Sequence, residues 1–111
     1  MLSGASKLYT HEYLPLALND MVEIVSYISH ELKNPSAADR LSDKLVESVE
    51  KMMEFPYANP AYIPIRPLEH EYRRMVVENF IVFYWVDEEK KHVTIARVIY
   101  HRRNLETVFE K

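Results

Sequence analysis

Five arginines in the last third of the chain have the clearest potential for chemistry on an anion. They are Arg73, Arg74, Arg97, Arg102 and Arg103. A guanidinium group stays charged and presents a fork of donors that matches the oxygens of a phosphate or a carboxylate. The chain has a net charge of −3, yet its residues from 66 onward hold nine basic and eight acidic side chains. We therefore expect an anion-binding patch on one face of an acidic protein; the alternative is a set of ordinary solvated cations.

His101 lies beside two of these arginines in the sequence and could act as an acid or a base. Histidine can gain and lose a proton near neutral pH. Cleavage of RNA through the neighbouring 2′-hydroxyl needs a base, an acid and a cation that stabilises charge on the phosphate. Arginine suits only the last of these roles, because it does not give up its proton. The alternative for His101 is that it merely ends a strand.

The composition excludes several other classes of site. The chain has no cysteine and a single glycine, Gly4, which excludes thiolate metal sites, disulfides and a glycine-rich phosphate loop. The other histidines lack ligand spacing such as HxxxH, so we expect neither a metal nor a cofactor. The N-terminal segment has no signal-peptide core, and no apolar run is long enough to span a membrane. We predict a cytoplasmic protein with no membrane partner.

The first half of the chain predicts a strand followed by two helices. Residues 7–13 alternate as a strand does. Over residues 15–33, apolar residues recur at helical spacing and are expected to face the core: Leu18, Met21 or Val22, Val25, Ile28 and Leu32. Asn34 can cap a second helix, with Pro35 at its first position, and this helix runs to Phe55. Because the turn between the helices is so short, they should form an antiparallel hairpin. Asp20 lies between the apolar positions of the first helix and is expected to face water.

The second half predicts a connector and a three-stranded antiparallel meander. Residues 56–67 hold four prolines and should form an ordered, extended connector. Asn79 is expected to supply the left-handed residue of the first turn of the meander. The predicted strands are residues 72–78, 80–86 and 92–100.

These elements define one α+β domain over residues 7–111, with residues 1–6 as a flexible N-terminus and the helices on one face of the sheet. Alternation along the strands allows Arg73 or Arg74, but not both, to share a face with Arg97. Tyr84 is expected in the core.

Four stretches resemble the RelE/ParE superfamily, the bacterial toxins of type II toxin–antitoxin systems. Residues 72–77 and, after a short turn, 80–87 are similar to its paired strands; residues 93–103 are similar to its last strand, and residues 34–41 to its helix junction. The resemblance covers about residues 7–109. It implies a four-stranded sheet, a helical hairpin on one face, a positively lined concave face opposite, and a co-expressed antitoxin that wraps the toxin.

The resemblance also implies roles for individual residues. Arg103 falls where RelE-like nucleases keep a catalytic arginine, and our candidate catalytic set is Arg103, His101 and Arg73. Ile81 and Phe109 stand where those nucleases carry an arginine and a tyrosine, so the proton-transfer side is depleted. The residues predicted to bind phosphate or the target are Arg74, Arg97, Arg102, Tyr100 and Phe109. Because Arg97 and Arg103 are not expected in the core, alanine at either should relieve growth arrest without unfolding the protein.

The superfamily offers two routes to growth inhibition. RelE-like toxins enter the ribosome and cut messenger RNA, whereas ParE-like toxins poison DNA gyrase. A chain of negative net charge gains less affinity from neutralising the phosphates of an RNA-rich target. Together with the depleted catalytic set, this favours a toxin that binds and poisons gyrase. The alternatives are a ribosome-dependent mRNA endoribonuclease, that is an mRNA interferase, and a non-toxic binding module that retains the fold.

Overall fold

The computed structural model describes residues 8–64 and 66–101. Its elements are β1 (Thr10–Tyr13), α1 (Pro15–Ser26), the π-helical turn η2 (Tyr27–Glu31), α2 (Pro35–Met52), β2 (Arg73–Val77), β3 (Phe80–Asp87) and β4 (His92–Tyr100). This order confirms the predicted α+β arrangement. The predicted flexible N-terminus, residues 1–6, lies outside the described residues. No helix within the described ranges is long and apolar enough to cross a membrane.

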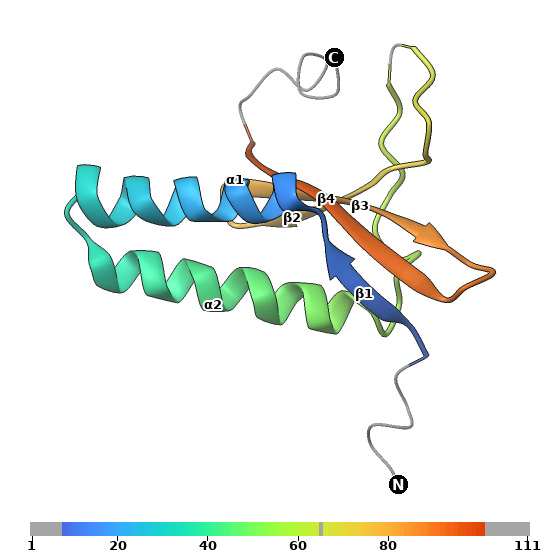
Figure 1. The fold of residues 1–111 in the computed structure, drawn as a ribbon, viewed down its shortest axis with the longest axis horizontal. Helices are drawn as coiled ribbons and strands as arrows, with labels where there is room; N and C mark the ends of the chain where they lie inside the picture. The colour runs from blue at the N-terminus through green and yellow to red at the C-terminus, as the bar shows by residue number, and fades with distance from the viewer. Residues whose placement is uncertain (1–7, 65, 102–111) are drawn as a thin grey trace, which may run out of the picture.

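The four strands form one mixed sheet in the order β1-β4-β3-β2. The strands β2, β3 and β4 make the predicted antiparallel meander, and β1 pairs parallel to β4 along residues 92–95. The helices α1 and α2 lie side by side as an antiparallel hairpin against the sheet (Figure 1). Since β3 and β4 are the inner strands, their side chains are buried on both faces, over residues 81–84 of β3 and over most of β4.

The helix α2 forms as its sequence predicts. The Asn34 side chain accepts a hydrogen bond from the Ala37 N–H at 3.2 Å, and Pro35 occupies the first turn, where its missing N–H costs nothing. The apolar residues at helical spacing are all buried: Ala38, Leu41, Leu45, Val49 and Met52. These side chains pack on the sheet and form the main core.

The helix α1 is rotated away from its predicted orientation. Of the residues predicted to face the core, Met21 and Ile28 pack partly against it, but Leu18 and Leu32 are 49% and 56% exposed. The buried residues of α1 are instead Ala17 and Asp20, with Ile24 packed partly against the core. The expectation that Asp20 faces water is therefore wrong, and the reason is the contact that its carboxylate makes with β4, described below.

The proline-rich connector begins at the helix-side core and continues to the opposite face of the sheet. The Tyr84 hydroxyl, on a fully buried ring, donates to the Pro56 carbonyl at 2.6 Å and accepts from Asn59 Nδ2 at 3.2 Å. Further along, Tyr62 packs edge-on against Phe83. A second, smaller cluster of buried side chains lies beneath this segment. The predicted core position of Tyr84 is confirmed.

The turn between β2 and β3 differs in one residue from the prediction. Its left-handed residue is Glu78, with φ at 55°, and not Asn79. Glu78 is also an ion-pair partner of Arg40 on α2, at 2.7 Å between Nη1 and Oε2. The carbonyl of Asn79 accepts the backbone N–H of His101 at 2.8 Å, which fixes the end of β4 beside the turn.

Candidate functional site

Arg97 is held in an internal ion pair with Asp20. Its Nε donates to Asp20 Oδ2 at 2.7 Å, and its second terminal nitrogen donates to Oδ1 at 2.9 Å. The two side chains are only 13% and 9% exposed. The hydrogen bonds from Arg97 to the carboxylate raise the pKa of this guanidinium above its ordinary value. The expectation that Arg97 lies free on the surface is therefore wrong.

The position of Asp20 follows from where β1 stops. The parallel pairing of β1 ends at Tyr13, and the Leu14 N–H donates to the Ile95 carbonyl at 2.9 Å. Beyond that point α1, and no strand of the described residues, lies beside the edge of β4. Asp20 Oδ2 accepts the backbone N–H of Val98 at 2.9 Å, so the carboxylate satisfies a donor that a neighbouring strand would otherwise take.

A β-bulge also contributes to the placement of Arg97. Phe83 pairs with Arg97 while Tyr84 pairs with Ile95, so β4 carries an extra residue at this point. A bulge bends its strand and redirects the neighbouring side chains. The sequence signal for the pair was weak, because Asp20 is one of several polar residues in α1, together with Asn19 and Glu23. A helical repeat alone assigns such a residue to the solvent face.

Arg73 is engaged with the connector. One terminal nitrogen donates to the Asn59 carbonyl at 2.7 Å and to the Tyr57 carbonyl at 3.3 Å. Its guanidinium carbon lies 4.9 Å from the centre of the Tyr57 ring, and its side chain is 17% exposed. Arg73 thus fastens the connector to β2. The catalytic role predicted for it would require these contacts to break.

Arg74 faces the other side of the sheet from Arg73, as alternation predicts. The strand register places Arg74 opposite Phe83 and Phe83 opposite Arg97, so these residues form one cross-strand row. The backbone N–H of Arg74 donates to the Pro60 carbonyl at 3.1 Å. The prediction that only one arginine of the pair shares a face with Arg97 is confirmed.

The end of β4 carries the remaining described candidates. Tyr100 is 48% exposed and its ring lies edge-on to Phe80, with 5.8 Å between ring centres. His101 is exposed and follows directly. The predicted site residues Arg102, Arg103 and Phe109 lie outside the described residues. Among the described residues, no group of three or more His, Asp or Glu side chains is arranged to hold a metal ion.

Glu88, in the turn after β3, ties distant segments together. It accepts hydrogen bonds from the hydroxyls of Tyr9 at 2.9 Å and Tyr57 at 2.8 Å, and it pairs with Lys91. These bonds lower the pKa of Glu88 to about 2. Loss of surrounding water and the bond to Glu88 raise the pKa of the Tyr57 hydroxyl to about 12. The N-terminal segment and the connector are thereby anchored to the same turn.

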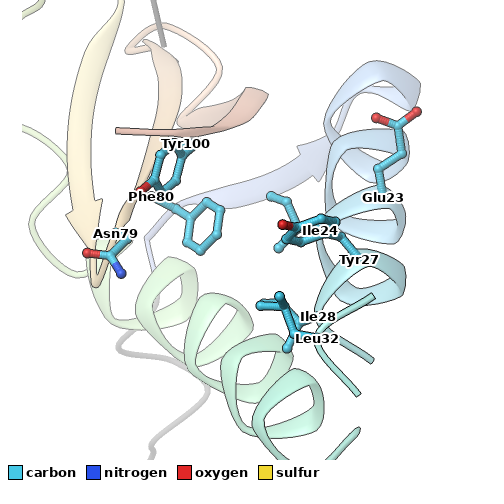
Figure 2. Close-up of a pocket in the computed structure, with 8 residues that line it drawn as sticks. All are labelled: Glu23, Ile24, Tyr27, Ile28, Leu32, Asn79, Phe80 and Tyr100. Carbon is cyan, nitrogen blue, oxygen red and sulfur yellow. The ribbon is translucent and has the colours of Figure 1, made fainter. Parts of the chain in front are cut away.

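An apolar groove lies between α1 and the start of β3, and no local sequence pattern indicates it. It has a volume of about 680 Å³ and is lined by Glu23, Ile24, Tyr27, Ile28, Leu32, Asn79, Phe80 and Tyr100. Figure 2 shows the side chains of α1 and η2 facing Phe80 and Tyr100 across this hollow. Groove-lining residues of this kind suit an apolar segment of a protein chain better than a charged small molecule.

The comparisons with known proteins agree with this fold. A family model described as the ParE toxin of the type II toxin–antitoxin system parDE matches residues 12–105. No curated protein matches the sequence.

Solved structures with the same fold include a chain of the chromosomal ParDE toxin–antitoxin system from P. aeruginosa, with 17% identity and a TM-score of 0.67 over 85% of this chain and 97% of that one. A chain of a RelBE toxin–antitoxin complex from Mycobacterium tuberculosis has 18% identity and a TM-score of 0.61, with coverages of 83% and 96%. A chain of the archaeal RelE–RelB complex from Pyrococcus horikoshii has 13% identity and a TM-score of 0.58, with coverages of 87% and 99%.

At these identities the structural likeness concerns the fold, whereas the family match spans most of the sequence. Both agree with the resemblance predicted from the residues. The chain belongs to the ParE toxin family of type II toxin–antitoxin systems.

Proposed function

We propose that this toxin arrests bacterial growth by binding and poisoning DNA gyrase in the cytoplasm, and that a cognate antitoxin neutralises it. The observation that carries the proposal is the pairing of Arg97 with Asp20. RNA cleavage requires cations that are free to meet the phosphate. The carboxylate of Asp20 already neutralises Arg97, and Arg73 is committed to the connector.

The charge of the molecule supports the same preference. A net charge of −3 disfavours entry into an RNA-rich target. Poisoning a protein target needs a binding surface and not a proton relay. The family match to ParE toxins agrees with such a target, because the resemblance to ParE-like toxins implies gyrase. The antitoxin is proposed because the three structural neighbours described above come from toxin–antitoxin systems.

The test incubates the toxin with gyrase, ATP and supercoiled plasmid, and in parallel with ribosomes translating a defined message. We expect linearised plasmid in the first reaction and an intact message in the second. Cuts in the message at codon positions would support the endoribonuclease instead. Inactivity in both reactions would support a non-toxic binding module, and either result would overturn the proposal.

Two variants locate the surface that meets the target. Arg103→Ala and Arg74→Ala should lower the yield of linear plasmid about 10-fold or more, since each removes a charged contact with the partner. Arg40→Ala is the matched control: it removes an arginine whose side chain is 64% exposed and whose ion pair with Glu78 lies at the helical side. Equal activity of all three variants would place the target-binding surface elsewhere.

A further inference from the structure

The apolar groove exposes large side chains to water at the end of α1. Tyr27 and Leu32 are each 56% exposed, and Tyr100 on the facing strand is 48% exposed. A contiguous apolar surface of this size on a small protein marks a contact with another segment or another molecule. Glu23 is the charged member of the lining among the described residues.

The chain leaves β4 at the rim of this groove. Tyr100, the last residue of β4, lines it, and the next residue, His101, is fixed by its N–H to the carbonyl of Asn79, which lines it too. Consecutive Cα atoms are about 3.8 Å apart, and His101 is the point from which the following segment must start. A segment of ten residues, such as residues 102–111, reaches about 15 Å as a helix and about 33 Å when extended.

The sequence of residues 102–111 suits such a position. Its apolar side chains are Leu105, Val108 and Phe109, spaced three and four residues apart, as on one face of a helical turn. The other residues are polar, and the segment begins with Arg102 and Arg103, opposite in charge to the Glu23 of the groove.

We propose that the groove is the docking site of this chain's own C-terminal segment, with Leu105, Val108 and Phe109 covering its apolar floor. A segment tethered at the rim is present there at an effective concentration in the millimolar range, so it occupies the groove ahead of a free partner of similar intrinsic affinity. Phe109 is then sequestered and is not displayed to the target. The proposal goes beyond the proposed function and is independent of which target the toxin attacks.

The absence of cysteine allows a clean test. A nitroxide is attached to the full-length variant Lys111→Cys, made by cell-free synthesis so that no host is inhibited. The methyl signals of Ile24, Ile28 and Leu32 should broaden strongly in its NMR spectrum. The control label, on Lys90→Cys, lies beyond the other end of β4, about 26 Å away along the strand, and should leave these signals sharp.

Two further samples decide how the segment reaches the groove. Adding Leu105→Asp and Phe109→Asp to the labelled chain should abolish the broadening while the amide spectrum stays folded. Mixing spin-labelled chain without isotopes with isotope-labelled chain without the nitroxide should give no broadening, because the contact is within one molecule. Sharp methyl signals in the Lys111→Cys sample, broadening that survives the aspartates, or broadening in the mixed sample would each overturn the proposal. The last result would assign the groove to a second copy of the chain.

Discussion

Replacing Asp20 with asparagine tests whether the internal ion pair stabilises this fold. The substitution keeps the shape of the side chain and removes its charge. Arg97 then remains beneath α1, 13% exposed, without the carboxylate that holds its Nε at 2.7 Å. The backbone N–H of Val98 keeps an oxygen to which it can donate, so the variant isolates the loss of charge.

The expected loss of stability is about 2–3 kcal/mol. Removing one partner of a buried pair costs about 3–5 kcal/mol, because it leaves the other charge uncompensated. The pair here retains a little contact with water and the amide oxygen still accepts one bond, so the expected loss falls just below that range. Asp20→Ala should cost about 1–3 kcal/mol more, since the Val98 N–H then has no acceptor. For a domain of this size, 1 kcal/mol shifts the melting temperature by about 4 °C.

The assay is urea unfolding followed by circular dichroism at 222 nm, on the wild type and three variants. Arg40→Ala is the control, because the Arg40–Glu78 pair has the same 2.7 Å contact but its side chains are 64% and 34% exposed. An exposed pair contributes about 1 kcal/mol or less. If Asp20→Asn cost no more than Arg40→Ala, burial would not strengthen the pair and the reasoning would be refuted.

Two other substitutions test contacts that anchor the connector. Glu88→Gln should reduce the loss of unfolding free energy that accompanies a fall in pH, whereas the neighbouring Glu89→Gln should not. The lowered pKa of Glu88 means that its carboxylate stabilises the fold above pH 4.5, and this contribution is lost as the pH falls from 4.5 towards 2. Urea midpoints at pH 7, 4 and 2.5 measure it, and identical acid limbs would contradict the assignment. Tyr84→Phe keeps the buried ring but removes the hydroxyl that bonds to Pro56 and Asn59, and should cost about 1–2 kcal/mol in the same assay; a loss below about 0.5 kcal/mol would count against it.

Much of the fold was predictable because its signals are local. The stripe of α2, its Asn34 cap and the alternation of the meander each depend on residues within a few positions of one another. The parallel pairing of β1 with β4 joins Thr10 to His92, and no local pattern specifies such a partner. The turn residue was also missed: Asn79 has the better intrinsic preference for the left-handed region, but Glu78 occupies it.

The candidate site was predictable only in part, because its decisive contact joins residues 77 positions apart. Periodicity assumes that a charged residue of a helix faces water. That assumption fails for Asp20, whose partners are a guanidinium and a backbone N–H on β4. The groove was missed for a related reason. Its lining includes Ile24 and Ile28, and these residues face it only because α1 packs this face towards the sheet.

The pair between Asp20 and Arg97 also explains how that face is chosen. The helix α1 and the turn η2 carry two apolar stripes, one through Leu18 and Val22 and one through Ile24 and Ile28, and either could in principle face the sheet. Asp20 lies one turn before Ile24 on the same side, so its contact with β4 turns that stripe towards the sheet. A buried ion pair often adds no more net stability than apolar residues of the same volume would, but a rotation of α1 would break the hydrogen bonds of Asp20 to Arg97 and to the Val98 N–H. In this toxin the excluded alternative is the rotation of α1 that would bury Leu18 and Val22 and remove Ile24 and Ile28 from the groove.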